Sequence, residues 1–445
     1  MTHDPVLRAL AATCPAARGA AVEDTLAGVS PRYAASPATV EQASALLRAA
    51  AEHGLAVVVR GGGSKLDWGM PPARCDLVLD TRLLDKVVEH AASDLVVRVQ
   101  AGVTLARLAD TLADAGQQLA LDPAPGAHMT CHAATVGGMV ATGAAGPRRL
   151  RYGAPRDLLI GLTVVRVDGT VAKSGGKVVK NVAGYDLGKL FAGSYGTLGL
   201  IVEAVFRLHP LPSRSAYLTS AYPDTAAADE AVAAVAASQL APSAVEAVRA
   251  CRDEPVQVGV LLEGDADGVG QRAGLVHGLL RSAAAAGSPR DVAVADSAPP
   301  WWGWGGEGAT LVRLAYWPGW FATVLRVVDD AAAVAGLDPW VGGSAAAGVV
   351  YASLPGSSDP AAVAAFVSGV RAVFARGPDG FGQGPAQPAD LPPALASAVV
   401  VRAPSAVRNL VDLWGPVPSP GLMRAVKDQF DPGHRMSPGR FAGGI

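Results

Sequence analysis

Apolar and polar positions near the start of the chain follow first a helical and then an extended pattern. Ser36 is a candidate N-cap with Pro37 at the first helical position, and Val40 opens an apolar face that runs to Gly54, a residue suited to end a helix. Residues 55–60 (LAVVVR) form a continuous apolar run that is too short for a helix of its own. The pattern therefore predicts a helix followed by a buried strand.

The same kinds of pattern continue to about residue 212. They predict a strand over 95–102, a helix that Thr104 caps and Gly116 ends, a hairpin over 159–175 with Asp168-Gly169 as its turn, and a strand over 197–212. We see no internal repeat in the sequence.

After Pro212 the pattern changes to short β-like runs between long alanine-rich helical stretches. The predicted strands and helices are strands over 257–262, 310–315, 349–354 and 398–401 and helices over 226–238 and 360–375. This order is typical of a ferredoxin-like α+β domain. A Gly/Pro/Gln-rich stretch over 376–393 predicts a surface loop, and the tail over 422–441 predicts a short helix followed by extended chain.

Composition narrows the class of protein. The 445 residues carry 37 basic and 39 acidic side chains, a net charge of −2, which argues against a nucleic-acid binder. No apolar run reaches the roughly 18 residues of a membrane helix. The first 20 residues loosely resemble a signal peptide, but Asp4, Arg8 and Pro15 interrupt that pattern, so we predict a cytoplasmic protein.

The four cysteines, at positions 14, 75, 131 and 251, form no C-x-x-C pair. An iron–sulfur cluster or a zinc site carried by this chain is therefore not expected, and neither are disulfides in a reducing compartment.

Two glycine-rich segments about 75 residues apart carry candidate chemistry. Arg60–Ser64 (RGGGS) follows a predicted strand, and its glycines leave backbone N–H groups free to turn toward one anion. Residues 134–146 (ATVGGMVATGAAG) are small enough for a bulky ligand to approach the backbone closely. Either segment alone could be a tight turn or an Ala/Gly-rich helix. Together they could hold one diphosphate from two sides.

A third segment, 173–201, is dense in hydrogen-bonding groups and lies between two predicted strands. These groups are Lys177, Lys180, Asn181, Tyr185, Asp186, Ser194 and Thr197. Because the segment also holds four glycines and Leu190-Phe191, we predict a folded loop packed against another part of the molecule rather than a solvated linker.

The ordered series RGGGSK, ATVGG, GGKVVKNVAGYDL…GSYGTLGLI and FDPGHRMSPGR resembles the vanillyl-alcohol-oxidase / p-cresol-methylhydroxylase (PCMH) type of FAD-binding fold. Within it, KxxKNVAGYDLxxLxxGSxGTLG is most similar to the FAD-binding subunits of bacterial glycolate oxidases, which are related to D-lactate and D-2-hydroxyglutarate dehydrogenases. The resemblance covers about residues 33–212 and the tail. It implies an α+β protein with a two-subdomain PCMH-type FAD-binding domain (1–212), a ferredoxin-like α+β cap domain (213–400) and a C-terminal segment (401–445) that returns to the FAD-binding domain.

The resemblance also implies a role for particular residues. The positions that match the family's FAD-binding motifs are Arg60, Gly61, Gly62, Gly63 and Ser64 in the first diphosphate loop, Thr135, Gly137 and Gly138 in the second, Thr142 and Gly143 beside the flavin, Asp157 before the next strand, and Gly199 and Ile201 on a strand that meets FAD. Anionic diphosphate suits such backbone donors.

Ser64 stands where covalent members of the family carry a histidine, so the histidyl link to flavin cannot form and we predict noncovalent FAD. Cys131 and His132 lie just before ATVGG, and a cysteinyl link there is the alternative. A small apolar thiol in a tight segment is the simpler interpretation of Cys131.

The D-2-hydroxyacid dehydrogenases carry a histidine-and-carboxylate metal motif of the HGDGN type that this sequence lacks. The histidines after Pro212 are His277 and His434, and neither has a metal-ligand neighbour at useful spacing, so we predict no metal and leave the catalytic base unassigned. The resemblance implies a small 2-hydroxyacid substrate, a second flavoprotein subunit and an iron–sulfur subunit, with any membrane association supplied by a partner.

Other polar and aromatic groups leave alternatives open. Trp301–Trp320 holds five of the eight tryptophans and predicts either an aromatic wall or partner surface, or core packing. Arg313 and Tyr316 could bind a carboxylate. The basic run Arg148, Arg149 and Arg151 predicts a solvated face, and His128 and His209 predict structural roles.

Three functions remain in competition. The first is an FAD-dependent oxidoreductase subunit that passes hydride from a 2-hydroxyacid such as glycolate to flavin and electrons onward to a partner. The second is an FAD-binding electron-relay or assembly subunit without turnover of its own, and the third is a stand-alone oxidase of another alcohol or sugar.

Overall fold

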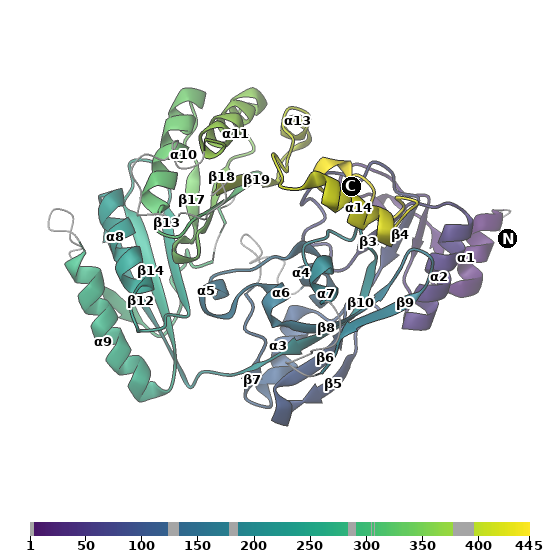
Figure 1. Cartoon of the computed structure of the whole chain (residues 1–445), viewed down its shortest axis with the longest axis horizontal. Coiled ribbons are helices and arrows are strands. Elements are labelled where there is room, and N and C mark those ends of the chain that lie inside the picture. The colour runs from purple at the N-terminus through teal and green to yellow at the C-terminus, as the bar shows by residue number, and fades with distance from the viewer. Residues whose placement is uncertain are drawn as a thin grey trace.

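The computed structural model describes residues 4–122, 133–177, 186–283, 291–303, 305–306, 308–376 and 396–445. Figure 1 shows two halves side by side, with the N-terminal part of the chain on the right and the green elements of the second half on the left. The yellow C-terminal segment returns from the second half and lies over the first.

The first half begins with a four-stranded sheet. Its order is β1 (Arg18–Gly19), β2 (Tyr33–Ala35), β4 (Leu77–Asp80) and β3 (Val57–Arg60), with β2, β4 and β3 parallel and β1 antiparallel. Helices α1 (Pro5–Thr13) and α2 (Val40–Glu52) pack on it through a core that includes Leu10, Leu46 and Leu77.

The segment that resembles a signal peptide is thus part of this fold, since α1 buries Leu10 and is capped by Asp4, whose carboxylate accepts from Val6 N at 2.9 Å. Helix α2 begins later than the sequence predicts. Its N-cap is Thr39 and not Ser36, because the Thr39 hydroxyl accepts from Gln42 N at 3.2 Å. Its end is as predicted, with Gly54 at φ +62°.

A five-stranded antiparallel sheet follows, with a two-stranded pair beside it. Its order is β5 (Val87–Ala91), β6 (Val96–Gln100), β10 (Leu200–Arg207), β8 (Leu159–Val165) and β9 (Val171–Gly175), and the pair is β7 (Gln117–Gln118) with β11 (His209–Pro210). The helices of this part are α3 (Leu105–Ala113), α4 (Val136–Thr142), α5 (Arg149–Tyr152), α6 (Pro155–Leu158) and α7 (Gly188–Phe191). The predicted Thr104 cap is confirmed, and so is the hairpin of β8 and β9. Its turn is centred on Val167-Asp168 and not on Asp168-Gly169, because Gly169 N donates to Arg166 O (2.9 Å) and Gly169 follows the turn at φ +82°.

The second half is built on one antiparallel eight-stranded sheet. Its order is β15 (Ala293–Ala295), β12 (Arg214–Tyr222), β14 (Val256–Gly264), β13 (Ala244–Arg249), β17 (Trp340–Ser344), β18 (Val349–Leu354), β16 (Thr310–Tyr316) and β19 (Ala396–Arg402). Its helices are α8 (Thr225–Ala236), α9 (Ala266–Ser282), α10 (Phe321–Ala335) and α11 (Pro360–Phe374).

The predicted ferredoxin-like topology is present twice in this sheet. Strands and helices β12-α8-β13-β14-α9-β15 and β16-α10-β17-β18-α11-β19 have the same βαββαβ order, and β13 pairs with β17 to join them. The expectation of no internal repeat was therefore wrong at the level of topology. The two units share a strand order but no sequence signal that we could detect.

One face of the large sheet is apolar and carries the helices, while the other faces the first half. Alternate positions such as Val312, Leu314 and Tyr316 pack with α8–α11. On the opposite face, Arg148 of the first half pairs with Asp122 (Nε–Oδ1 2.7 Å) and reaches Glu263 of β14 (3.7 Å). Arg148 is therefore part of the contact between the halves and not of a solvated face.

The C-terminal segment ties the chain together. After α13 (Ser405–Arg408), helix α14 (Pro420–Phe430) lies over the first half, and Met436 forms a parallel bridge to Val57 of β3. Lys427 is fully buried, and its Nζ donates to Asp431 (2.7 Å), Thr197 O (2.7 Å) and Met436 O (2.9 Å). Within the described residues, no helix is both long and apolar enough to cross a bilayer.

Candidate functional site: a cavity between the glycine segments

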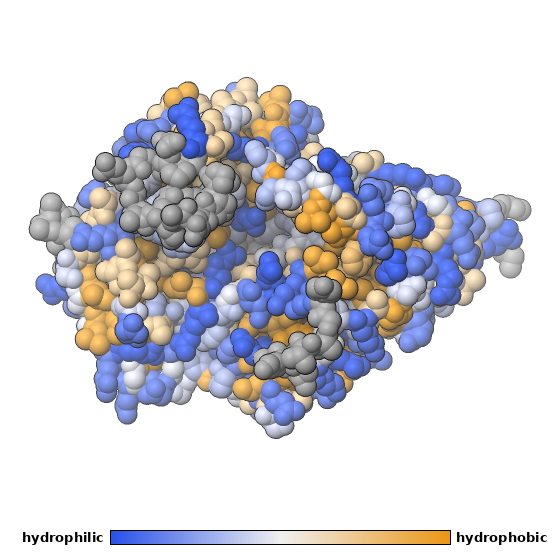
Figure 2. All heavy atoms as spheres, viewed as in Figure 1, coloured by the Kyte–Doolittle hydropathy of each residue, from blue (hydrophilic) through white to orange (hydrophobic). Residues whose placement is uncertain are grey.

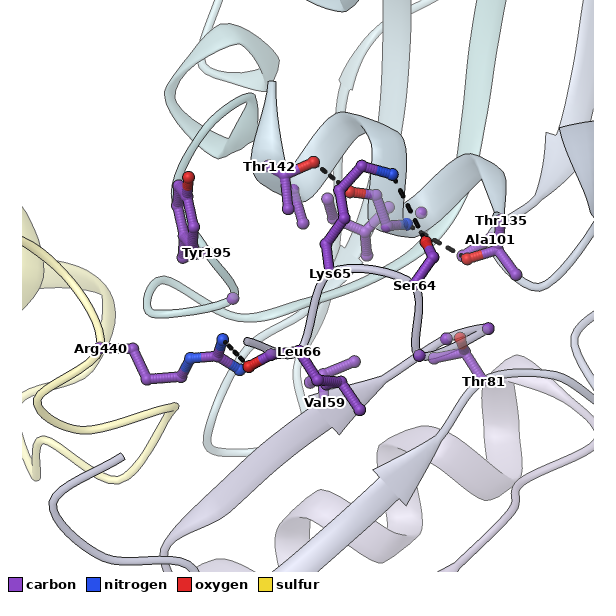
Figure 3. Close-up of a pocket in the computed structure, with 18 of the residues that line it drawn as sticks. Val59, Ser64, Lys65, Leu66, Thr81, Ala101, Thr135, Thr142, Tyr195 and Arg440 are labelled. Atoms are coloured by element: carbon purple, nitrogen blue, oxygen red, sulfur yellow. Dashed lines mark hydrogen bonds between the residues drawn. The ribbon is translucent and has the colours of Figure 1, made fainter. Parts of the chain in front are cut away.

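A cavity opens where the two sheets of the first half meet. Its lining comes from the end of β3, the loop after it, the start of α4, the loop before β10 and the C-terminal segment (Figure 3). The lining residues are Val59, Gly61, Gly62, Gly63, Ser64, Lys65, Leu66, Thr81, Ala101, Thr135, Gly137, Gly138, Ala141, Thr142, Tyr195, Gly196, Gly199, Ile201 and Arg440.

The first glycine loop is pressed against the second segment so closely that side chains would not fit. A Cβ on Gly62 would lie 1.4 Å from Ala133 O, and one on Gly61 would lie 2.3 Å from Thr135 Oγ1. Gly63 adopts φ +82°, a conformation that L-residues rarely take. Glycine at positions 61 and 62 is therefore required by the contact between the two segments, and glycine at 63 is favoured by its backbone conformation.

The two segments differ in what they offer a ligand. Among the described residues, no acceptor is found for the backbone N–H groups of residues 61–65, which leaves them available to an anion. In the second segment, Val136 N and Gly137 N donate to Val103 O (2.9 Å) and Ala101 O (2.8 Å). The first loop therefore supplies the free amides, and the second segment supplies close packing and hydroxyl groups.

The cavity is positively charged. Its lining contains Lys65 and Arg440 and, among the described residues, no aspartate or glutamate. Burial lowers the pKa of Lys65, whose Nζ makes a long contact of 3.4 Å to Ser64 Oγ. Free amides, two cations and no carboxylate are the donor set that a dinucleotide diphosphate requires, so the residues fit FAD.

Tyr195 forms one wall of the cavity. Its backbone is left-handed (φ +55°), and its N–H donates to Ala141 O at 2.8 Å. The ring packs edge-on against Trp414 at 5.0 Å, and burial raises the pKa of the phenol to about 12. Tyr195 is therefore a neutral, fixed hydrogen-bonding group held in a strained conformation, which is a feature common at functional sites.

The structure brings most of the predicted site residues together. Ten of the thirteen predicted positions line the cavity, and three do not. Arg60 pairs with Asp24 (3.0 Å) and Asp80 (3.1 Å), and Asp157 accepts from Ala154 N (2.8 Å) at the start of α6. Gly143 ends α4 at φ +64°, where a Cβ would lie 3.4 Å from Gly193. These three residues have structural partners.

Sequence reasoning missed several lining residues. Lys65, Tyr195 and Arg440 lie inside the motifs RGGGSK, GSYGTLG and SPGR, so the motifs contained the signal. Thr81 and Ala101 directly follow β4 and β6, and a rule that examines the residue after each strand would have found them.

Several predicted groups prove structural or lie outside the described residues. Ser194 and Thr197 are buried and donate to Phe191 O and Ser194 O. Lys177 is exposed and pairs with Glu89. The positions outside the described residues are Lys180, Asn181, Tyr185, His128, Cys131 and His132.

The second half presents polar side chains toward this region. Arg313 of β16 lies opposite Tyr351 of β18, and Tyr351 packs with Tyr195 and Trp68 in one cluster. Figure 2 shows a hollow between the two halves on this side of the molecule. Tyr316, by contrast, packs among the helices and donates to Ala345 O at 3.3 Å, so the prediction that it could bind a carboxylate with Arg313 was wrong.

Some tryptophans of the segment Trp301–Trp320 lie in the core and others lie on a contact surface, so both predicted roles occur. Trp320 is buried in the core under the helices. Trp301 and Trp302 lie on the opposite face, over Gly259, where a Cβ would be 2.6 Å from the Trp301 ring. Gly303 then approaches Pro147 of the first half. The segment thus supplies both core packing and part of the contact between the halves.

Glu246 of β13 is buried beside a small cavity that Arg149, Ser344 and Tyr351 also line. Burial raises its pKa to about 8, although a hydrogen bond from Ser344 opposes the shift. The folded protein therefore keeps a proton that the unfolded chain, with an ordinary pKa of 4.5, loses. The free energy of unfolding should fall as pH rises from about 4.5 to about 8.

Glu246→Gln is expected to reduce that slope by ~1 kcal/mol per pH unit, since it removes one proton from the difference between the two states. Urea unfolding at pH 5, 6, 7 and 8 measures it, with the exposed Glu230→Gln as control. If the slope of the unfolding free energy against pH in Glu246→Gln equals that of the parent protein, the raised pKa assigned to Glu246 is contradicted.

Comparison with solved structures finds proteins of similar fold. The fold is similar over 98% of this chain and 96% of the other to p-cresol methylhydroxylase with bound substrate, at a TM-score of 0.73 and 16% sequence identity. The chain thus has an α+β fold similar to that of p-cresol methylhydroxylase (PCMH). Residues 31–175 match a family model described as an FAD binding domain.

Relatives in sequence include proteins named as a glycolate oxidase subunit and a D-lactate dehydrogenase. The chain is 34% identical over 211 residues to glycolate oxidase subunit GlcD of Bacillus subtilis (47% of this chain, 44% of that protein). It is 39% identical over 223 residues to D-lactate dehydrogenase of Archaeoglobus fulgidus (49% and 48%). The chain matches about half the length of these curated relatives.

Proposed function

We propose that this chain is an FAD-dependent oxidoreductase, the FAD-binding subunit of a glycolate or related 2-hydroxyacid oxidase or dehydrogenase complex. The observation that carries the proposal is the cavity with free amides at residues 61–65, two cations and no described carboxylate. When bound, FAD supplies the acceptor for a hydride from the substrate. The relatives named above support the substrate class.

The chain's own residues would bind the cofactor and orient the substrate against it. The amides of residues 61–65 and the Ser64 hydroxyl would hold the diphosphate, with Lys65 as counter-charge. Arg313, whose partner across the strands is Tyr351, would bind the substrate carboxylate on the face of the sheet turned to the cavity. Gly199 and Ile201 at the start of β10 would meet the cofactor with backbone and apolar surface.

We also propose that the flavin is noncovalent. Among the described lining residues there is no histidine or cysteine to form a link, and Ser64 occupies the position at which a histidine would be needed. Electrons would leave to a partner, which we propose to be a second flavoprotein subunit and an iron–sulfur subunit.

The test is the visible spectrum of the purified chain before and after acid precipitation, followed by anaerobic glycolate and D-lactate. We expect a flavin spectrum that moves entirely to the supernatant, and bleaching by at least one hydroxyacid that Arg313→Gln slows. Yellow colour in the pellet would contradict the noncovalent assignment. A flavin that no hydroxyacid bleaches until partner subunits are added would favour the electron-relay alternative.

A further inference from the structure

Two opposite charges from different halves of the molecule line one small cavity without pairing. Arg149 belongs to α5 of the first half, and α5 lies against β13 of the second half, which carries Glu246 (Figure 1). Among the described residues, no carboxylate lies within 4.0 Å of the Arg149 guanidinium, and no cation lies that close to Glu246. The neighbouring Arg148, by contrast, pairs with Asp122 at 2.7 Å. Arg149 is therefore available to a ligand.

Glu246 is a neutral acid at this cavity. Its carboxyl group is buried and accepts a hydrogen bond from the Ser344 hydroxyl. Burial raises its pKa to about 8, and the charge of Asp122 adds to the rise, while Ser344 and Arg149 oppose it. Behind the sheet, burial also raises the pKa of Tyr316, so this phenol carries no charge near neutral pH. A protonated carboxyl group donates a hydrogen bond and does not repel an anion.

Tyr351 connects this cavity to the place where we propose that the substrate carboxylate binds. It lines the cavity and lies directly opposite Arg313 on the neighbouring strand, so both residues belong to the same face of the sheet. The charge of Arg313 in turn opposes the rise that burial causes in the pKa of Tyr195, a wall of the cavity between the glycine segments. The order outward from that cavity is therefore Tyr195, Arg313, Tyr351 and then the pair Arg149 and Glu246.

The donors in this order match a ligand with two carboxylates. A guanidinium binds a carboxylate through two parallel hydrogen bonds, and Arg313 and Arg149 offer two such groups with Tyr351 between them. The neutral Glu246 adds a donor beside Arg149 and leaves the positive charge of Arg149 uncompensated. A monocarboxylate such as glycolate would use Arg313 alone.

On the basis of the proposed function, we propose that the cavity of Arg149 and Glu246 is a subsite for a second carboxylate, and that the preferred substrate is a 2-hydroxyacid with a carboxylate at its distal end. The 2-hydroxyacid end lies at Arg313, beside the cavity between the glycine segments. The distal carboxylate accepts hydrogen bonds from the Arg149 guanidinium and from the protonated Glu246. The subsite contributes binding and specificity, and no bond is made or broken there.

The experiment is isothermal titration of the oxidised, FAD-loaded chain with 2-oxoglutarate and with 2-oxovalerate, which has the same chain length but no distal carboxylate. We expect the parent protein to bind 2-oxoglutarate more tightly by roughly tenfold or more. Arg149→Gln should remove this preference, whereas Arg313→Gln should weaken the binding of both oxoacids. The control is Arg151→Gln on the same helix, because Arg151 lies over the Tyr152 ring and does not line the cavity.

The pH dependence of binding tests the part played by Glu246. Because the complex holds the protonated acid, the affinity for 2-oxoglutarate should fall as pH rises above about 8, by up to about tenfold per pH unit. Glu246→Gln keeps a donor that does not titrate, so its affinity for 2-oxoglutarate should not fall in this range. The affinity for 2-oxovalerate should show no such fall in either protein.

The outcomes separate this proposal from the function on which it rests. A chain that binds no FAD, or that holds FAD and binds neither oxoacid, overturns the proposed function. A chain that holds FAD and binds both oxoacids equally well overturns the subsite alone, and so does an unchanged preference in Arg149→Gln. If Arg149→Gln does not hold FAD, Glu246→Gln decides, and an affinity that falls with pH as in the parent protein overturns the subsite.

Discussion

Replacing Gly62 with alanine is expected to weaken FAD binding by about a hundredfold. The new Cβ would lie 1.4 Å from Ala133 O, and because both groups belong to backbone, no rotamer change relieves the overlap. Overpacking of this kind costs roughly 1–3 kcal/mol, and the upper end corresponds to two powers of ten in affinity. The loop would move away from the second segment and turn its free amides from their common target.

The measurement is an FAD titration of the apo chain followed by flavin fluorescence. Gly421→Ala is the matched control, because a Cβ there meets nothing within 4 Å. An affinity for FAD in Gly62→Ala equal to that of the control would mean that the first loop does not hold the cofactor.

Replacing Asp431 with alanine is expected to lower the free energy of unfolding by ~3–5 kcal/mol. Asp431 and Lys427 are both fully buried, and Asp431 also accepts from Met436 N at 2.6 Å. Without the carboxylate, Lys427 is left as a buried ammonium with two carbonyl groups, and burial already lowers its pKa.

Urea unfolding at pH 7 checks this prediction. The double variant Lys427→Met/Asp431→Leu should recover much of the loss, because an apolar pair removes the unpaired charge. A loss below 1 kcal/mol in Asp431→Ala would show that water reaches Lys427 and that the tail is held less tightly than its burial indicates.

The sequence alone predicted which segments line the cavity. It did not predict that the lining carries Lys65 and Arg440. The glycine loop, Thr135 and the start of β10 could be predicted because close backbone contact demands small residues in a fixed order. Arg440 could not be assigned, since its position depends on a tail that returns to Leu66 across 374 positions. The pairing of Tyr316 with Arg313 as carboxylate ligands was wrong, because residues three apart on β16 lie on opposite faces of the sheet.

The secondary structure was predictable where local signals were strong. The Thr104 cap and the hairpin of β8 and β9 are set by neighbouring residues, and both are present, although the turn lies one residue earlier than predicted. The predicted start of α2 was wrong because Ser36 and Thr39 are both good cap residues, and the hydrogen bond from Gln42 N to the Thr39 hydroxyl sets the start at Thr39. The doubled βαββαβ order appears only when strand pairing is known.

The tail also bears on how the cofactor enters. Arg440 contacts Leu66 and Trp68 across 374 and 372 positions, and Met436 bridges to Val57. During synthesis the ribosome must release residue 440 before this end of the cavity can close. If the cavity holds FAD as proposed, it would reach its closed form only once the tail is in place, so folding of the tail and retention of the flavin would be coupled late in the maturation of the protein.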